Sequence, residues 1–213
     1  MGRLLDILRT SKLGVAIHLT LWLGLCLYGL ASLLAYSQTP GLSARPPHRT
    51  NVDVPRPADS SCYELVVAIH PHCPCTRATL EQLSRILRAT QKQLRVTALF
   101  YCPGDVPDSF VETDLLSTAQ SLPGTTIVID LDGAQAARFQ MYTSGATVLY
   151  APSGEPVFFG GITVSRGHAG DCLGTDAVIA AVNRQERLAT HTNVYGCPLR
   201  APDACLEGAY CGQ

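Results

Sequence analysis

The sequence predicts an α/β domain with a mixed central sheet and helices on both of its faces, preceded by one transmembrane helix. Two observations support this prediction. The chain of 213 residues has a long uncharged run near its N-terminus, and the remainder alternates short β-branched runs with amphipathic stretches. The formal net charge of −1 argues against a nucleic-acid-binding protein, which usually shows a basic surplus or stripe.

Residues 13–36 form the uncharged run, LGVAIHLTLWLGLCLYGLASLLAY. A helix that crosses a bilayer needs about 20 apolar residues, whereas the apolar region of a cleaved signal peptide has about 7–15. We therefore expect an uncleaved signal-anchor, with a cleaved signal peptide as the alternative. Arg3, Arg9 and Lys12 precede the run. The positive-inside tendency then places residues 1–12 in the cytoplasm and exports the rest of the chain.

Residues 37–61 contain five of the fourteen prolines and almost no large apolar side chain. This composition predicts an extended spacer between the membrane and the exported domain. Export also accounts for the nine cysteines, because disulfides persist in oxidising compartments.

The first half of the domain shows a strand, a helix and a second strand. Residues 63–71, YELVVAIHP, are an apolar, β-branched run that ends at a proline, as in a buried strand. Residues 76–91 place four aliphatic side chains on one helical face, which predicts an amphipathic helix. Residues 95–102, RVTALFYC, read as the second strand.

The second half continues the alternation. We expect a helix over 112–121, a third strand over 125–132 and one or two helical turns over 134–141. Residues 146–161 predict two strands joined by a Pro-Ser-Gly turn. A last helix is expected over 176–188, so the domain covers about 62–190 and a Cys-rich tail covers 191–213.

Cys73 and Cys75 lie between the first strand and its helix, in the motif HPHCPCTRATL. The free N–H groups and the dipole of a helix N-terminus stabilise an anion and lower the pKa of a thiol there. A thiolate in that place is both a good nucleophile and a good leaving group, as thiol–disulfide exchange requires. Pro74 fixes its own φ and presets the turn into the helix.

The strand, the Cys-Pro-Cys motif and its helix, followed by LYAPSGEPVFFGG, resemble the thioredoxin-like superfamily. HPHCPCTRATL together with GGITVSRGHAGD and YGCPL resembles, more narrowly, the membrane-anchored bacterial RedB-type thioredoxin-like proteins. The resemblance implies a three-layer α/β/α fold and a periplasmic domain anchored in the bacterial inner membrane. It also implies protein thiols or disulfides as substrates and an external redox partner.

Two features depart from the superfamily. One residue separates Cys73 from Cys75, whereas thioredoxin has two between its cysteines. The stretch 143–147, where the superfamily has a cis-proline facing the dithiol, contains no proline. The absence removes a usual substrate-docking feature and leaves more room for a metal or another ligand.

Exchange requires defined roles for the cysteines. Cys73 is expected to be the exposed attacking thiol and Cys75 its resolving partner, or the reverse. Cys197, in YGCPL, is a hypothetical resolving thiol that reaches one of them, and a structural bridge for the tail is the alternative. No nucleotide cofactor is expected, because the sequence has no glycine-rich phosphate loop after a strand.

The competing function is delivery of copper or another metal. His70, His72, Cys73 and Cys75 lie within six residues, and imidazole and thiolate suit copper or zinc. His168 is the obvious distant ligand candidate. A second alternative is a non-catalytic interaction module on a membrane tether.

The remaining polar features have structural interpretations. Asp171 is predicted to be the N-cap of the last helix, and Arg166 could hold an anion or orient a carboxylate. Six cysteines are expected to brace the domain and its tail, although the sequence does not choose among their fifteen pairings. These are Cys62, Cys102, Cys172, Cys197, Cys205 and Cys211.

Overall fold

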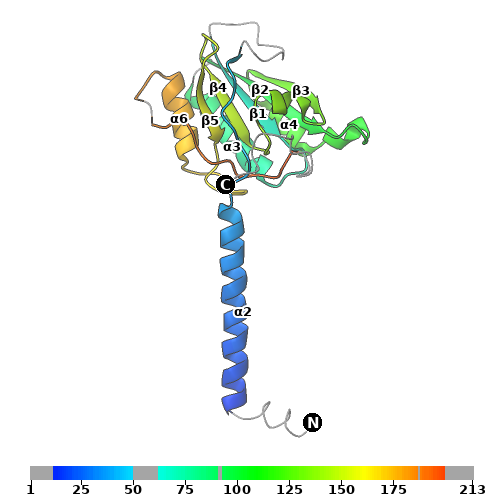
Figure 1. The fold of residues 1–213 in the computed structure, drawn as a ribbon, viewed down its shortest axis with the longest axis vertical. Coiled ribbons are helices and arrows are strands. Elements are labelled where there is room, and N and C mark those ends of the chain that lie inside the picture. The colour runs from blue at the N-terminus through cyan, green and yellow to red at the C-terminus, as the bar shows by residue number, and fades with distance from the viewer. Residues whose placement is uncertain (1–11, 50–61, 91–92, 187, 200–213) are drawn as a thin grey trace. The chain divides into compact units, whose positions relative to one another are not determined.

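The structure is a computed structural model that describes residues 12–49, 62–90, 93–186 and 188–199 (Figure 1). The chain divides into two compact units, Met1–Thr39 and Pro40–Gln213. Cys205 and Cys211 lie outside the described residues, as do the cytoplasmic residues expected before Lys12 and residues 50–61 of the expected spacer.

Helix α2, Lys12–Gln38, makes up the described part of the first unit. Its residues Gly14–Gln38 are long and apolar enough to cross a membrane, which confirms the predicted apolar helix. Two of its polar side chains bond to its own backbone. Thr20 donates to the carbonyl of Ala16 at 2.8 Å, and the His18 ring donates to that of Gly14 at 2.7 Å. These two donors are therefore satisfied within the helix, as a membrane-spanning segment requires.

The second unit is built on a five-stranded sheet of order β3-β2-β1-β4-β5 (Figure 1). β1 pairs in parallel with β2, and β2 with β3, whereas β4 pairs antiparallel with both β1 and β5. The predicted mixed sheet is confirmed. The strands are β1 Tyr63–Ile69, β2 Leu94–Cys102, β3 Thr125–Leu131, β4 Ala146–Tyr150 and β5 Pro156–Gly161.

Each face of the sheet buries its own apolar cluster. Alternate side chains of β1 point to opposite faces, so Leu65 and Val67 join one cluster and Val66 joins the other. Helices α3, α4 and α6 cover the first face. The short helix α5 covers the second, together with extended segments from both ends of the unit. The helices are α3 Cys75–Ala89, α4 Asp114–Ser121, α5 Ala134–Arg138 and α6 Leu173–Val182, with a 3-10 turn η2 at Asp108–Val111.

Residues 40–49 belong to the second unit and pack against the rest of it, whereas their composition predicts an extended spacer. Gly41 donates its backbone N–H to Val194 at 2.8 Å. Arg49 forms a buried ion pair with Glu64 of β1, with Nε 2.8 Å from Oε2. A proline-rich segment has few apolar side chains to bury, but its backbone and one paired charge are enough to hold it on the sheet.

Helix α6 begins and ends earlier than predicted. It ends at Val182 because Arg184 takes a left-handed conformation, with φ of 55°. Gln185 then donates to the carbonyl of Ala180, which closes the helix end. The predicted cap is also wrong: Cys172 is the N-cap, and the carboxylate of Asp171 instead lies 3.3 Å from the Arg85 guanidinium.

Candidate functional site

The Cys-Pro-Cys motif lies where the sequence places it, between β1 and α3. Pro74 is the N-cap with φ of −58°, and Cys75 is the first residue of the helix. Ser144, in the loop before β4, ties this turn to that loop. Its hydroxyl accepts from the backbone N–H of His70 at 3.0 Å and lies 3.3 Å from the Thr76 hydroxyl, which in turn donates to the carbonyl of His70 at 3.0 Å.

The structure brings three thiols together at this helix start. The Sγ atoms of Cys73 and Cys197 lie 3.0 Å apart, and the Cys75 thiol also hydrogen-bonds to Cys73. Cys73 is 1% exposed and Cys75 is 8% exposed, whereas Cys197 is partly exposed. The expectation of an exposed attacking thiol at position 73 is therefore wrong, because Cys197 and its segment cover it.

Cys73 is the thiol best able to hold a negative charge. Hydrogen bonds from Cys75 and then from Cys197 lower the pKa of Cys73 to about 4, although its burial opposes them. The hydrogen bond with Cys73, then burial and the charge of Cys73, raise the pKa of Cys75 far above its usual range. Burial, with the nearby Cys73, raises the pKa of Cys197 to about 11. These pKa shifts favour a thiolate at Cys73 between two protonated thiols, Cys75 and Cys197.

The position of Cys197 is set by backbone pairing. Its carbonyl accepts from the N–H of Ser144 at 2.8 Å, and Leu199 donates to Tyr142 at 3.0 Å. Pro198 bridges Thr143 in the antiparallel sense. Residues 197–199 therefore lie antiparallel to residues 142–144, whereas Val194 pairs with Gly41. The side chains of Val194 and Leu199, at the two ends of this segment, are buried in the second core cluster.

Gly196 allows the closest approach in this pairing. A Cβ atom at this position would overlap the carbonyl oxygen of Ser144. Only glycine lets the two backbones lie this near, and the approach brings the neighbouring Cys197 within reach of Cys73.

The loop Ile162–Asp171 contacts the thiol cluster from another side. Arg166 donates to the carbonyl of Gly196, and its positive charge acts to lower the pKa of Cys197 against the effect of burial. The backbone N–H of Gly167 donates to the Cys75 thiol. Arg166 thus holds the cysteine segment, and its interpretation as a partner for an anion or a carboxylate stays a prediction.

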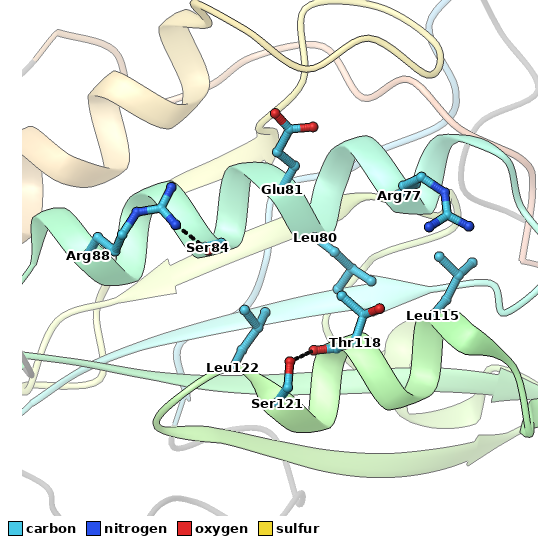
Figure 2. Close-up of a pocket in the computed structure, with 9 residues that line it drawn as sticks. All are labelled: Arg77, Leu80, Glu81, Ser84, Arg88, Leu115, Thr118, Ser121 and Leu122. Carbon is cyan, nitrogen blue, oxygen red and sulfur yellow. Dashed lines mark hydrogen bonds between the residues drawn. The ribbon is translucent and has the colours of Figure 1, made fainter.

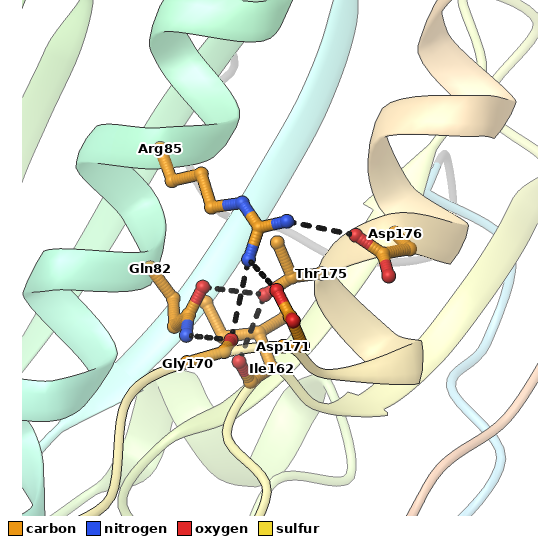
Figure 3. A network of polar contacts seen from close by, with 7 residues as sticks. All are labelled: Gln82, Arg85, Ile162, Gly170, Asp171, Thr175 and Asp176. Carbon is orange, nitrogen blue, oxygen red and sulfur yellow. Dashed lines mark hydrogen bonds and ion pairs between the residues drawn. The ribbon is translucent and has the colours of Figure 1, made fainter.

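A polar network fixes the base of this loop to helices α3 and α6 (Figure 3). Gln82 donates to the carbonyl of Gly170 at 2.6 Å, and the Thr175 hydroxyl lies 2.9 Å from the carbonyl of Ile162. Arg85 reaches both Asp171 and Asp176, at 3.3 and 3.4 Å. Both ends of the loop are thus bonded to α3 and α6, and its middle residues contact the cysteines.

The histidines of the motif are engaged elsewhere. The His72 ring donates to the carbonyl of Phe110 at 2.9 Å, and the His70 ring stacks on Tyr101 with centroids 5.3 Å apart. His168 lies in the exposed loop, its ring bonded to the carbonyl of Arg166 at 2.7 Å. Within the described ranges, no group of three or more His, Cys, Asp or Glu side chains is arranged to hold a metal ion.

A separate groove of about 350 Å³ lies between α3 and α4 (Figure 2). Arg77, Leu80, Arg88 and Leu115 are among its lining residues. It contains neither a thiol nor an imidazole. We therefore assign it no part in the chemistry of the cysteines.

Comparison with known proteins supports the fold. No protein-family model matches the chain, and no curated protein does. Among solved structures, an uncharacterised conserved protein from Geobacillus kaustophilus is 16% identical, with a TM-score of 0.55 over 79% of this chain and 96% of that one. A hypothetical protein from Sinorhizobium meliloti is 20% identical, with a TM-score of 0.54 over 66% and 80% of the two chains.

A secreted disulfide oxidoreductase from Mycobacterium tuberculosis is more distant, at 18% identity and a TM-score of 0.41 over 58% of this chain and 82% of that one. The narrower resemblance to RedB-type proteins stays a prediction. The resemblance to the thioredoxin-like superfamily is supported by the fold. Three parallel strands continue into an antiparallel pair, the helices pack on the sheet, and the cysteine motif follows β1. This chain therefore has the thioredoxin-like fold.

Proposed function

We propose that the protein is a membrane-anchored thiol–disulfide exchange protein whose reactive centre is Cys73. The observation that carries the proposal is the 3.0 Å approach of the Cys73 and Cys197 sulfurs beside the Cys75 thiol, at the start of α3. A central thiolate with two thiol neighbours can form a disulfide with either one. Its low pKa makes it a good leaving group when such a disulfide is opened.

The helix Gly14–Gln38 supports the anchoring part of the proposal. With Arg3, Arg9 and Lys12 on its N-terminal side, the positive-inside tendency puts the N-terminus in the cytoplasm. The thioredoxin-like unit then works in the periplasm of a bacterial inner membrane. Its substrates are protein thiols or disulfides, and an external redox partner resets it.

The test is redox equilibration of the full chain in detergent micelles. The protein is incubated in glutathione buffers of graded potential, quenched with acid, and mapped by mass spectrometry. We expect a disulfide at Cys73 that forms and opens reversibly, and its loss in Cys73→Ser. Cys172→Ser is the matched control, because this equally buried thiol at the start of α6 lies outside the cluster. A Cys73 that stays reduced in every buffer would exclude exchange.

The same preparation tests the two alternatives. Copper delivery through this site would rely mainly on the cysteines, because the His72 ring is bonded to Phe110 and the His70 ring, although near Cys73, is stacked on Tyr101. It predicts stoichiometric copper that survives dialysis and protects Cys73 from alkylation. A non-catalytic interaction module predicts neither exchange nor bound copper.

A further inference from the structure

We propose that the disulfide this protein hands to its substrates joins Cys73 to Cys197, and that a substrate thiol attacks it at the sulfur of Cys197. This inference rests on the proposed exchange function and goes further. It names the pairing, the point of attack and the direction of electron flow. The protein acts as an oxidant of protein dithiols.

The pairing follows from how the two candidate partners of Cys73 are held. Cys197 lies on an extended segment that backbone hydrogen bonds hold on both sides of it. Leu199 donates to Tyr142, and Val194 accepts from Gly41. Its sulfur is 3.0 Å from that of Cys73, so closure to a bond of about 2.05 Å needs a movement of only about 1 Å. Cys75 is instead fixed as the first residue of a helix, with only a helical Pro74 between the two cysteines.

The point of attack follows from exposure. Cys73 is 1% exposed, so an incoming thiolate has no path to its sulfur while the segment is docked. Cys197 is the partly exposed member of the pair. An attacking thiolate approaches a disulfide in line with the bond, and the outer sulfur is the one it can meet.

The structure also favours Cys73 as the group that leaves. Its charge is stabilised by the Cys75 S–H and by the backbone N–H groups of Cys197 and of Cys75, the first residue of α3. A stabilised thiolate in the reduced form makes the corresponding disulfide more oxidising. Cys75 therefore acts as a positioning residue that donates to the leaving sulfur, and Arg166 holds the segment through Gly196.

The exchange balances in two steps. A substrate thiolate bonds to Sγ of Cys197, the Cys73–Cys197 bond breaks, and Cys73 leaves as the thiolate. A second thiolate of the same substrate attacks the substrate sulfur of the mixed disulfide. Cys197 leaves and takes up a proton. The substrate dithiol has lost two electrons, the cysteine pair has gained them, and a disulfide of another protein restores the pair by the same exchange.

Oxidised full-length protein in detergent micelles tests the proposal, with reduced glutathione as the probe. The disulfides are first mapped by mass spectrometry, and we expect the Cys73–Cys197 bond. A short reaction with limiting glutathione, quenched with acid, should then yield the glutathione adduct on Cys197 with Cys73 free. Cys197→Ser should slow glutathione oxidation about tenfold or more, and Cys172→Ser should leave it within about twofold.

The outcomes separate this inference from the proposed function. A reversible Cys73–Cys75 bond, an adduct on Cys73, or full oxidation of glutathione by Cys197→Ser would overturn the inference while exchange at Cys73 stands. A Cys73 that forms no disulfide in any glutathione buffer would remove the proposed function itself. Circular dichroism of each variant shows whether a loss reflects the missing thiol or a lost fold.

Discussion

Replacing Arg49 tests whether residues 40–49 belong to the folded unit. The Arg49 guanidinium donates to Glu64 at 2.8 and 3.2 Å, and both side chains are almost fully buried. Thr97 also donates to this carboxylate, at 3.2 Å. Arg49→Met keeps an apolar chain of similar length but removes the Arg49 charge from the buried ion pair with Glu64.

Removing one partner of a buried ion pair costs about 3–5 kcal/mol, against a total stability of about 5–15 kcal/mol for a typical domain. For a unit of this size, that loss lowers the melting temperature by roughly 6 to 20 °C. The assay is urea or thermal unfolding followed by circular dichroism. The double variant Arg49→Met with Glu64→Leu is the control, because an apolar pair can replace a buried ion pair at little cost.

A melting temperature unchanged in Arg49→Met would refute this reasoning and return residues 40–49 to the role of a spacer. A double variant as unstable as the single one would also count against it, since it would show that the loss comes from packing and not from breaking the Arg49–Glu64 ion pair. The same argument places the start of any soluble fragment at Pro40. A fragment that begins at residue 57 should be destabilised as Arg49→Met is, and should also lose the bond from the Tyr150 hydroxyl to Pro47.

Three further predictions concern the site. Gly196→Ala should push residues 194–199 away from Ser144 and speed the alkylation of Cys73 by iodoacetamide. The control Asn193→Ala, which changes an exposed side chain just before this segment, should leave the alkylation rate unchanged. The ultraviolet absorbance of the Cys73 thiolate should persist below neutral pH and disappear near pH 4. The folded pKa is lowered, so the stability that the thiolate gives the reduced protein is complete above the unfolded value of about 8.5 and declines as the pH falls to about 4. Thr175→Val should cost about 1–3 kcal/mol in urea unfolding, because its buried hydroxyl bonds to Gln82 and Ile162. Ser84→Ala should cost less, because Ser84 is only half-buried on α3 and bonds to the solvent-accessible Arg88.

Local pattern was enough to predict the elements that bury an apolar face. The β-branched run of β1 and the helical face of α3 appear in the sequence as they do in the fold, and the position of Cys73 and Cys75 between them follows directly. The boundaries of α6 did not follow, because its end depends on a left-handed Arg184. Hydrophobic periodicity does not indicate which residue takes a left-handed conformation and ends a helix.

The contacts that make the site are long-range, and for that reason they could not be derived from the motif alone. His70 and His72 look like ligands because they are adjacent in sequence, but each ring has a partner on β2 or η2. Cys197 is separated from Cys73 by 124 positions. In the motif YGCPL, the glycine immediately before the cysteine is a feature that the sequence shows. The structure explains it, because a side chain at Gly196 would overlap the carbonyl of Ser144.

The missing proline, the one-residue spacing of Cys73 and Cys75, and the position of Cys197 are structurally related. Where the resemblance leads one to expect a cis-proline, this chain has Ser144 and Gly145, and the N–H of Ser144 donates to Cys197. A proline at position 144 would have no N–H to give, so the absence of proline is what permits this bond. The one-residue spacing of Cys73 and Cys75 places both thiols at the helix start, where Cys75 can donate to Cys73 while Cys197 occupies the open side. The proposed reactive unit is therefore the pair of cysteines in the motif together with the Cys197 segment, which Ser144 and Arg166 bond to it.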